Sequence, residues 1–480
     1  MHKRRATTIC TLVLPALGFL TACTVGPDYE PPEVTIPESF RYAAEDVVDA
    51  EGEEVLWWRL FGDAQLEGYI DEALHQNQDL LIAIARVQEF ESRLGISRSQ
   101  RMPSVDFGAT GGYQQVSGET GLVPIRGDDR RSEFYQLDLS ARWELDVWGR
   151  ISRSNEAAMA DLLASVENRR AIVLSLITAV AESYITLLSL DEQLAIAKRS
   201  LKAREQSLTL FERQREEGVI SRLEVSQLRS EYERTAATLP ALQREIARLE
   251  HALSVLLGRV PGPIERVEGL DQVDLPRVPG GLPSDLLQRR PDVQLAEQQM
   301  ISANAQIGVA VAEYYPRVSL TGLLGVASNE LQNLPTGQAV LYQIAAGAAG
   351  PIFSGGRIRS GVELAEAVKE QAVQQYAQVV LFSLREVENA LVTLETIEQE
   401  SGAIGRQVDA LRTYSELAGK RYDNGYVSFI EVLDAERDLF DSELREAQLD
   451  AQVFLSVIQL YSAFGGGWVD AADEMVVDSR

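Results

Sequence analysis

The residues of this chain that could take part in catalysis are few. The 480-residue sequence has three histidines, His2, His75 and His251, and two cysteines, Cys10 and Cys23. It contains no G-x-S-x-G nucleophile motif, no Walker phosphate loop, no H-E-x-x-H zinc motif and no cysteine cluster. His75 and His251 fall in helical patterns, where they are ordinary polar positions. We therefore expect no enzyme, no metal site and no cofactor.

One group of charged residues has a spacing that merits separate consideration. Ile430, Glu431, Asp434 and Arg437 stand at positions i, i+1, i+4 and i+7 of a helical stretch. Ile430, Asp434 and Arg437 therefore share one helix face. From spacing alone, Asp434 and Arg437 are an ordinary (i, i+3) surface ion pair.

Composition excludes several classes of protein. The chain has 72 acidic and 45 basic residues, a net charge of −27. A surface this acidic repels phosphate, so we expect no nucleic acid as partner. A hydrophobic content of 45% argues against a disordered chain. After the N-terminus we find no uninterrupted apolar run of about 18 residues, which excludes a multi-pass helical transporter.

The N-terminus has the pattern of an export signal that ends in a lipidation site. Lys3, Arg4 and Arg5 precede an apolar run, and Leu20-Thr21-Ala22-Cys23 follows it. That tetrapeptide resembles the lipobox of bacterial lipoproteins, in which the cysteine is acylated and becomes the first residue. We predict a signal peptide over 1–22 and a covalent lipid on Cys23; the alternative is a general signal peptide. Thr24, in place of an aspartate, favours sorting to the outer membrane.

The rest of the chain contains an internal duplication. Residues 211–225 align with 418–432 at a shift of 207, so that Gly218 matches Gly425. Gly95 matches Gly308 at a shift of 213. A Pro/Gly-rich stretch separates the copies. The predicted segments are a lipidated N-terminal segment (23–62), a first repeat (63–258), a linker (259–282), a second repeat (283–464) and a C-terminal tail (465–480).

Each repeat begins with a predicted helix, from Asp63 to Arg101 or from Pro283 to Tyr315, that ends before a proline. Two strands follow. Between Tyr135 and Val147, apolar and polar residues alternate strictly, which gives a strand one apolar and one polar face. Four such strands per chain are too few to close a membrane barrel, which starts at about eight. A trimer would supply about twelve; the alternative is one sheet on a soluble core.

The two long helical stretches of each repeat have a seven-residue period. Val173, Val180, Leu187, Leu194, Leu201 and Leu208 form one track. Such a period is typical of left-handed coiled coils. The stretch from Ser152 to Glu217 would reach on the order of 100 Å as one helix. The fold class is therefore mainly α, with coiled-coil hairpins and four strands.

Together these features resemble the outer-membrane factor family, the TolC-like channels, in its lipoprotein efflux branch. The resemblance covers Cys23 to Trp468, and it rests on Gly26-Pro27-Asp28-Tyr29, Trp57-Trp58, Gln288-Arg289-Arg290-Pro291-Asp292-Val293, Lys420-Arg421-Tyr422 and Leu433-Asp434-Ala435. It implies a homotrimer whose β-barrel in the outer-membrane lipid continues into a periplasmic α-helical barrel. It also implies a periplasmic adaptor and an inner-membrane RND-type pump as partners.

The resemblance also assigns roles at the periplasmic end. Ile430 would be the apolar gate residue, Glu431 and Asp434 the acidic ring, and Arg437 the partner of that ring. Tyr422 would bond Glu224 of the other hairpin and hold the channel shut. The first copy has Gln227 and Ser230 where the second has Asp434 and Arg437, so we expect the constriction to come mainly from the second copy.

The predicted function is a passive, gated outer-membrane duct for small molecules in a tripartite efflux system. Two alternatives stay open from sequence: a lipid-anchored coiled-coil tether, and an exit duct for type I protein secretion. The absence of Met/His-rich tracts gives no support to a copper role. The sequence does not identify the transported substrate, the pump or the adaptor.

Overall fold

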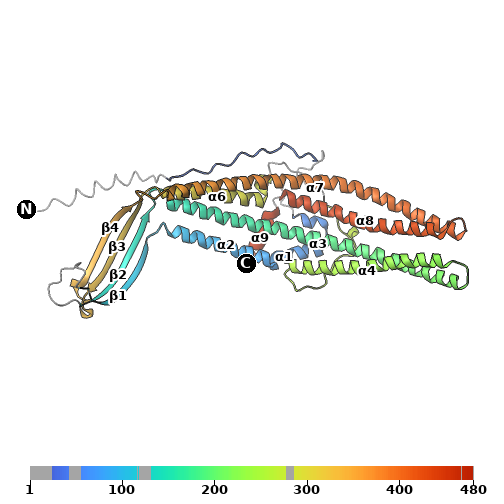
Figure 1. Cartoon of the computed structure of the whole chain (residues 1–480), viewed down its shortest axis with the longest axis horizontal. Coiled ribbons are helices and arrows are strands. Elements are labelled where there is room, and N and C mark those ends of the chain that lie inside the picture. The colour runs from blue at the N-terminus through green and yellow to red at the C-terminus, as the bar shows by residue number, and fades with distance from the viewer. Residues whose placement is uncertain are drawn as a thin grey trace, which may run out of the picture. The chain divides into compact units, whose positions relative to one another are not determined.

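The computed structural model describes residues 24–42, 56–115, 117, 131–276, 286–465 and 468–478. The predicted signal peptide and the predicted lipidation site, Cys23, lie outside the described residues. The main elements, in chain order, are α1 (Ala64–Gln76), α2 (Gln78–Ser99), β1 (Ser104–Gln115), β2 (Arg131–Leu145), α3 (Arg150–Glu216), α4 (Arg222–Leu256), α5 (Leu286–Arg289), α6 (Pro291–Ala312), β3 (Arg317–Ser328), β4 (Val340–Ala349), α7 (Arg357–Asp423), α8 (Phe429–Phe464) and α9 (Trp468–Asp478) (Figure 1). Short 3₁₀ turns include η2 (Trp57–Phe61), η3 (Leu270–Gln272), η5 (Leu331–Asn333) and η6 (Gly337–Ala339).

The chain divides into two compact units. Unit 1 comprises 1–33, 88–164 and 296–375, and it contains the sheet together with the helix segments that adjoin it. Unit 2 comprises 34–87, 165–295 and 376–480, and it is helical. Both units combine segments from both repeats, so neither repeat is an independent domain.

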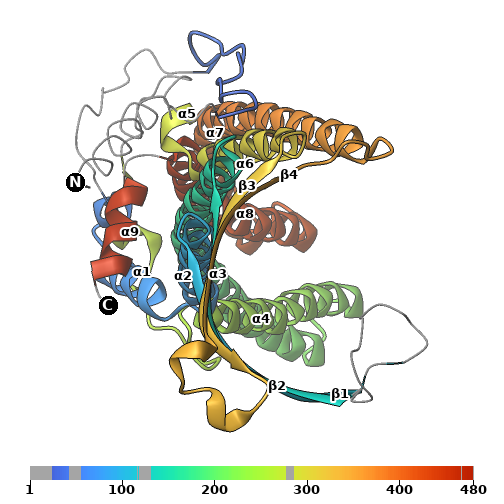
Figure 2. The same ribbon diagram turned by 90° about the vertical axis from the view of Figure 1, so that its left-hand side faces the viewer.

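The sheet of unit 1 has four antiparallel strands in the order β1-β2-β3-β4, and its strands follow a curved path (Figure 2). β2 of the first repeat pairs directly with β3 of the second, and Leu139 lies opposite Leu324. The four strands predicted from alternation are confirmed.

The strand register places apolar residues of all four strands on the same face. Three rows cross the sheet on that face: Val105-Ala141-Gly322-Ile344, Phe107-Leu139-Leu324-Tyr342 and Ala109-Leu137-Val326-Val340. Most of the large side chains in these rows are exposed in the single chain. The rows on the other face are polar on β1 and β2 and mixed on β3 and β4: Asp106-Ser140-Leu323-Gln343 and Gly108-Asp138-Gly325-Leu341. A sheet with one exposed apolar face and a second, more polar face is suited to lipid on one side and water on the other.

The single helix predicted from Asp63 to Arg101 is wrong: the structure has two helices, α1 and α2, with a break at Asn77. The Asn77 side chain accepts a hydrogen bond from the Leu80 N–H (3.0 Å) and donates one to the Leu256 carbonyl (2.9 Å). Asparagine is a preferred residue at helix N-termini because its side chain competes with the helical backbone. In the second repeat, α5 and α6 are likewise separate, with Arg290 before Pro291 between them.

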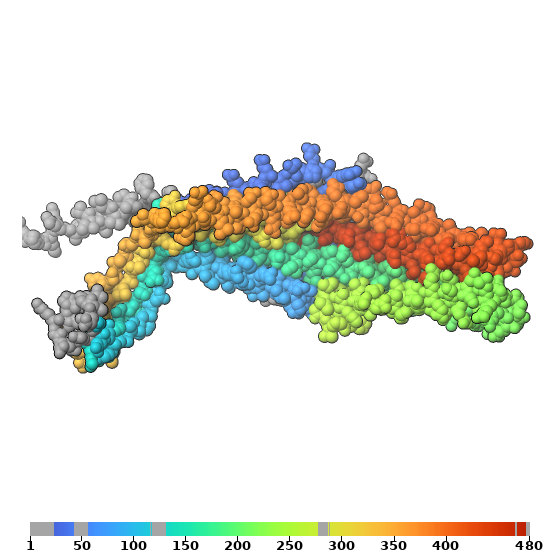
Figure 3. Space-filling view, in the orientation of Figure 1, coloured from blue at the N-terminus to red at the C-terminus, as the bar shows by residue number. Residues whose placement is uncertain are grey.

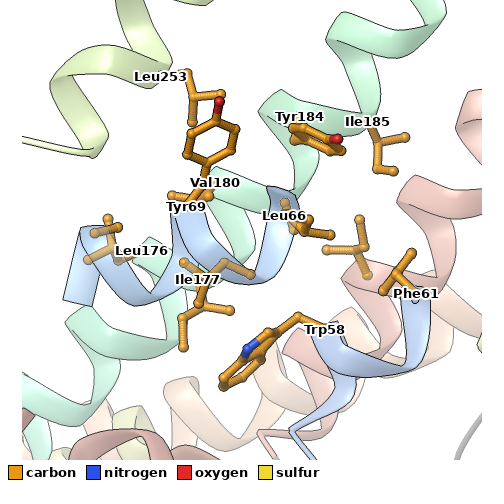
Figure 4. Close-up of a cluster of buried hydrophobic side chains, with 14 of the residues drawn as sticks. Trp58, Phe61, Leu66, Tyr69, Leu176, Ile177, Val180, Tyr184, Ile185 and Leu253 are labelled. Atoms are coloured by element: carbon orange, nitrogen blue, oxygen red, sulfur yellow. The ribbon is translucent and has the colours of Figure 1, made fainter. Parts of the chain in front are cut away.

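The core of unit 2 forms where η2 and α1 pack on α3 (Figure 4). Trp58 and Phe61 are almost fully buried with Leu66, Ile177 and Val180. Asp63 begins α1 by accepting from the Gln65 N–H (2.8 Å). The other oxygen of the same carboxylate accepts from the Tyr184 hydroxyl at 2.6 Å. One buried carboxylate therefore both begins α1 and joins it to α3.

Among the described helices, α3 alone contains an 18-residue window that is long and apolar enough to cross a membrane. Half of that window is buried inside the structure. Core helices of other proteins meet the same test, and Val173, Ile177 and Tyr184 of α3 belong to the core of unit 2. We therefore assign this stretch to packing between helices.

Candidate functional site

The two long helical hairpins, α3–α4 and α7–α8, reverse direction with the same backbone geometry. Gly218 and Gly425 follow the first helix of each hairpin with φ angles of 80° and 77°. The N–H of the next residue donates to a carbonyl five residues back, Val219 to Gln214 (2.8 Å) and Tyr426 to Arg421 (2.9 Å). This pattern ends a helix at a glycine in the left-handed region. The duplication seen in sequence is thus retained at the two hairpin ends.

The ends of the two hairpins lie side by side (Figure 3), and a small apolar cluster joins them. Phe211 of α3 and Phe429 of α8 have ring centroids 4.2 Å apart. Tyr422 of α7 stacks on Phe211 at 6.2 Å and contacts Phe429 at 5.2 Å. The predicted gate residues are therefore carried by helices that a common core holds together.

Ile430, Asp434 and Arg437 lie in the first turns of α8, next to this cluster. Ile430 is half exposed. The Arg437 guanidinium lies 2.9 Å from the Asp434 carboxylate, and both side chains are partly exposed. A second contact joins Arg437 to Asp438 at 3.6 Å. An exposed pair at i, i+3 contributes about 0.2–1 kcal/mol, so it adds little to folding and can separate at low cost.

Glu431 and its first-repeat equivalent, Glu224, have different partners. Glu224 accepts from the Ser221 N–H at 2.8 Å, while the Ser221 hydroxyl accepts from the Glu224 N–H, which forms a capping box at the start of α4. Glu431 instead accepts from Arg421 at 3.4 Å. Arg421 was not among the predicted gate residues, although the Lys420-Arg421-Tyr422 stretch marks its position in sequence.

Tyr422 lies close enough to Glu224 for the charge of that carboxylate to act on its hydroxyl. Burial first, and then the charges of Glu224 and Asp423, raise the pKa of the Tyr422 hydroxyl above its usual value of 10.0. In the described part of this single chain, the hydrogen bonds of the Glu224 carboxylate go to its own helix end rather than to this phenol. The two side chains therefore interact electrostatically, and the closing link stays a prediction.

A second set of charges lies further along the hairpins and was not predicted. The Arg204 side chain of α3 is almost fully buried, and it donates to the carboxylate of Glu231 on α4 at 2.9 Å. It also lies over the ring of Phe440 on α8, 5.6 Å from the centroid. Glu436, one turn before Phe440, has its pKa raised by burial, which the charge of Arg204 partly opposes. Arg204 therefore contacts both hairpins, and no sequence motif identified it.

In the described ranges, no group of three or more histidine, cysteine, aspartate or glutamate side chains could hold a metal ion. The candidate site is thus a set of paired charges around an apolar cluster. The apolar cluster and the ion pairs restrain the helices, and the charged side chains can attract or repel ions.

Comparison with known proteins shows clear relatives over almost the whole chain. The family described as outer membrane efflux protein matches residues 69–259 and 282–466. The cation efflux system protein CusC of Escherichia coli is 32% identical over 452 residues, covering 94% of this chain and 96% of CusC. The solvent efflux pump outer membrane protein SrpC of Pseudomonas putida is 33% identical over 466 residues, covering 95% and 98%.

Two further proteins extend the comparison. The probable outer membrane lipoprotein SilC of Salmonella typhimurium is 30% identical over 463 residues, covering 96% of this chain and 99% of SilC. Among solved structures, the outer-membrane channel OprN aligns with a TM-score of 0.85 and 31% identity, covering 93% of this chain and 100% of that one. The family resemblance drawn from the sequence and the mainly helical fold with a small membrane sheet are both confirmed.

Proposed function

Because this chain belongs to the outer membrane efflux protein family, we propose that it forms the outer-membrane channel of a tripartite efflux system. It is a passive, gated duct for small molecules, and a pump in the inner membrane supplies the energy. The observation that carries this proposal is the sheet of unit 1, whose apolar rows run in register through all four strands. A coiled-coil tether would need no such face.

The sheet also supports a homotrimer. Among the strands that the structure describes, the outer ones, β1 and β4, each pair with a single neighbour. Their free edges expose backbone groups that lipid cannot satisfy, so a membrane sheet must close on itself. Four strands are too few for closure, whereas three chains give about twelve, within the range of known membrane barrels.

We assign the periplasmic gate to Ile430, Glu431, Asp434 and Arg437. In a trimer each residue occurs three times, and carboxylates brought close together disfavour ionisation or attract cations. Arg437 neutralises Asp434 within each chain. Tyr422 and Glu224 would supply the closing link between hairpins, and the support is that the partly buried phenol feels the charge of the carboxylate.

We also propose that Cys23 carries a covalent lipid in the outer membrane. The support is the lipobox-like sequence of residues 20–23 and the name of SilC, which describes that relative as a lipoprotein. A periplasmic adaptor and an RND-type pump complete the system, as expected for a chain without energy-converting motifs. The names of its relatives mention cations and solvents, so we propose that the partner pump, rather than the duct, selects the substrate.

Single-channel recording in planar lipid bilayers tests the proposal. We expect small, infrequent currents from the wild type, and larger and more frequent currents after Asp434→Ala combined with Arg437→Ala. A matched control is Glu245→Ala with Arg248→Ala, because that pair has the same i, i+3 spacing on α4 and a similar distance of 3.1 Å. The control should conduct like the wild type. Absence of current from both the wild type and the gate variant would refute a gated pore.

The same recordings test the closing link. Tyr422→Phe keeps the ring in the apolar cluster and removes only the hydroxyl, so we expect more frequent opening. Tyr426→Phe is the control, because Tyr426 is largely exposed at the neighbouring turn. Equal currents from Tyr422→Phe and the wild type would remove Tyr422 from the gate.

A further inference from the structure

Residues Thr24–Tyr29, which directly follow the predicted lipidation site, are bound along their whole length to unit 1. We call this segment the strap. The Val25 N–H donates to the Trp148 carbonyl (3.1 Å), Asn304 donates to the Pro27 carbonyl (3.0 Å), and the Tyr29 hydroxyl donates to Glu297 (3.0 Å). These partners come from the junction between β2 and α3 in the first repeat and from α6 in the second repeat.

Arg153 of α3 is the centre of this contact. Its side chain is only 6% exposed, and its guanidinium donates to the Asp28 carboxylate at 2.6 Å. The same group reaches the backbone carbonyls of Val25 (3.4 Å) and Gly26 (3.5 Å), and on its other side it pairs with Glu156 at 2.8 Å. A planar guanidinium with several fixed donors is suited to hold a backbone segment in one position.

Glycines make room for the strap on both sides. A Cβ on Gly149 would lie 2.7 Å from the Thr24 methyl carbon, and a Cβ on Gly26 would lie 2.5 Å from the Cα of Gly308. A Cβ on Gly308 would lie 2.7 Å from Cγ of Arg153 and 2.9 Å from the Val25 carbonyl oxygen. The strap backbone and the Arg153 side chain therefore lie too close to Gly26, Gly149 and Gly308 for a residue with a side chain at these positions. We call Trp148, Gly149, Arg153, Asn304 and Gly308 the socket.

The socket departs from the internal duplication. The position equivalent to Arg153 in the second repeat is Ser360, and the position equivalent to Gly308 in the first is Gly95. Nothing lies within 4 Å of a Cβ placed on Gly95. Arg153 thus has no equivalent arginine in the second repeat, whereas the two glycines of the socket, Gly149 and Gly308, are matched by Gly356 and Gly95.

We propose that Arg153 is a positioning residue for the lipid anchor. Together with the glycines of the socket, it fixes the chain directly after Cys23 at the junction where β2 ends and α3 begins. The lipid then enters the membrane beside the strands and guides the sheet into the outer membrane during assembly. This inference rests on the proposed lipidation of Cys23.

Chain geometry explains why the strap matters. Consecutive Cα atoms are about 3.8 Å apart, so an anchor on Cys23 stays within a few ångströms of the socket while Thr24 is bound. Without the strap, the next described residue of the N-terminal segment that is buried is Phe40. A flexible chain from 24 to 39 has a root-mean-square reach on the order of 20 Å. By holding the strap, the socket keeps the strands close to the lipid anchor. Their effective concentration at the membrane surface is therefore higher than with a free N-terminal segment.

The test measures assembled trimer in outer membranes, from unheated gels, in two backgrounds. One background is the lipidated full-length chain. The other carries Cys23→Ser behind a signal peptide that the general signal peptidase cleaves, so that no lipid is attached. In the lipidated chain, Arg153→Ala and Gly308→Ala should each lose most of the trimer while intact mass still shows the lipid. Gly95→Ala is the matched control and should assemble normally. Asp28→Ala should have a smaller effect, because that side chain is 89% exposed.

The unlipidated Cys23→Ser background separates positioning from folding. If Arg153 acts through the anchor, the unlipidated chain assembles poorly and Arg153→Ala reduces its trimer no further. An equal loss in both backgrounds would show that Arg153 only stabilises the fold, and normal assembly of lipidated Arg153→Ala would also overturn the inference. If the unlipidated chain assembles as well as the lipidated chain, the inference is also overturned. Channel currents from the unlipidated chain would then show that the proposed function still holds. If intact mass shows no lipid on the wild type, lipidation of Cys23 itself is refuted.

Discussion

At the scale of single residues, Glu436 shows how a buried charge affects stability. Its pKa lies above the usual value of 4.5, chiefly because of burial, with the charge of Arg204 acting in the opposite direction. A carboxyl group with a raised pKa in the folded protein favours folding only in its protonated form. Below the unfolded pKa both states are protonated and the group has no effect. As the pH rises through the folded pKa, stability falls.

We therefore expect Glu436→Gln, which imitates the protonated form, to be more stable than the wild type above about pH 4.5. The difference should grow with pH until the wild-type carboxyl is fully ionised. Arg204 keeps its bond to Glu231, so no buried charge is left unpaired. Thermal unfolding of the detergent-solubilised protein across a pH series measures the effect.

Glu416→Gln is the control for this series. Its pKa is lowered by the hydrogen bond to Lys420, and its side chain is exposed, so its substitution should change the melting temperature little and in the opposite direction. A wild type that is more stable than Glu436→Gln at neutral pH would mean that the Arg204 charge outweighs the cost of burial.

At the scale of elements, the two hairpin ends allow a matched comparison. Gly218 and Gly425 have the same left-handed φ, and a Cβ at either position meets nothing within 4 Å. Alanine there is costly only through backbone conformation, about 1–2 kcal/mol. We expect Gly218→Ala and Gly425→Ala to lower the free energy of unfolding by equal amounts, as measured by denaturant titration.

Gly419→Ala is the control, because Gly419 lies inside α7 with open space around it. Alanine should stabilise the helix there by up to about 1 kcal/mol. A much larger loss at one hairpin end than at the other would indicate that this end has a role beyond reversing the chain.

The elements also show which features the sequence predicts well. Long helices and alternating strands follow from periodicity, because each side chain is assigned to a face by local spacing. The break at Asn77 was missed, since it depends on a bond to Leu256, which is remote in sequence. At the candidate site, the positions of Asp434 and Arg437 follow from helical spacing. The Glu431–Arg421 pair and the buried Arg204 depend on how helices pack, which no local pattern records.

At the scale of the whole molecule, closure of the sheet by three chains requires that its two faces meet different solvents. Neighbouring residues of β2 test this directly. Leu139 lies in the apolar row with Phe107 and Leu324, whereas Ser140 lies on the opposite face, opposite Asp106 and Leu323. The two positions share a strand, a depth in the sheet and a backbone environment.

We expect Leu139→Arg to prevent assembly and Ser140→Arg to permit it. An arginine on the lipid face of a membrane barrel costs about 2–4 kcal/mol near the midplane, and three chains incur that cost together. An arginine on the water-filled side incurs no comparable cost. Light scattering of the detergent-extracted protein, corrected for detergent and lipid, should give the mass of three chains for the wild type and Ser140→Arg. Trimers of Leu139→Arg with loss of Ser140→Arg would mean that the faces are reversed. Trimers of both would place the sheet outside the lipid, and a stable wild-type monomer would leave four strands without a barrel.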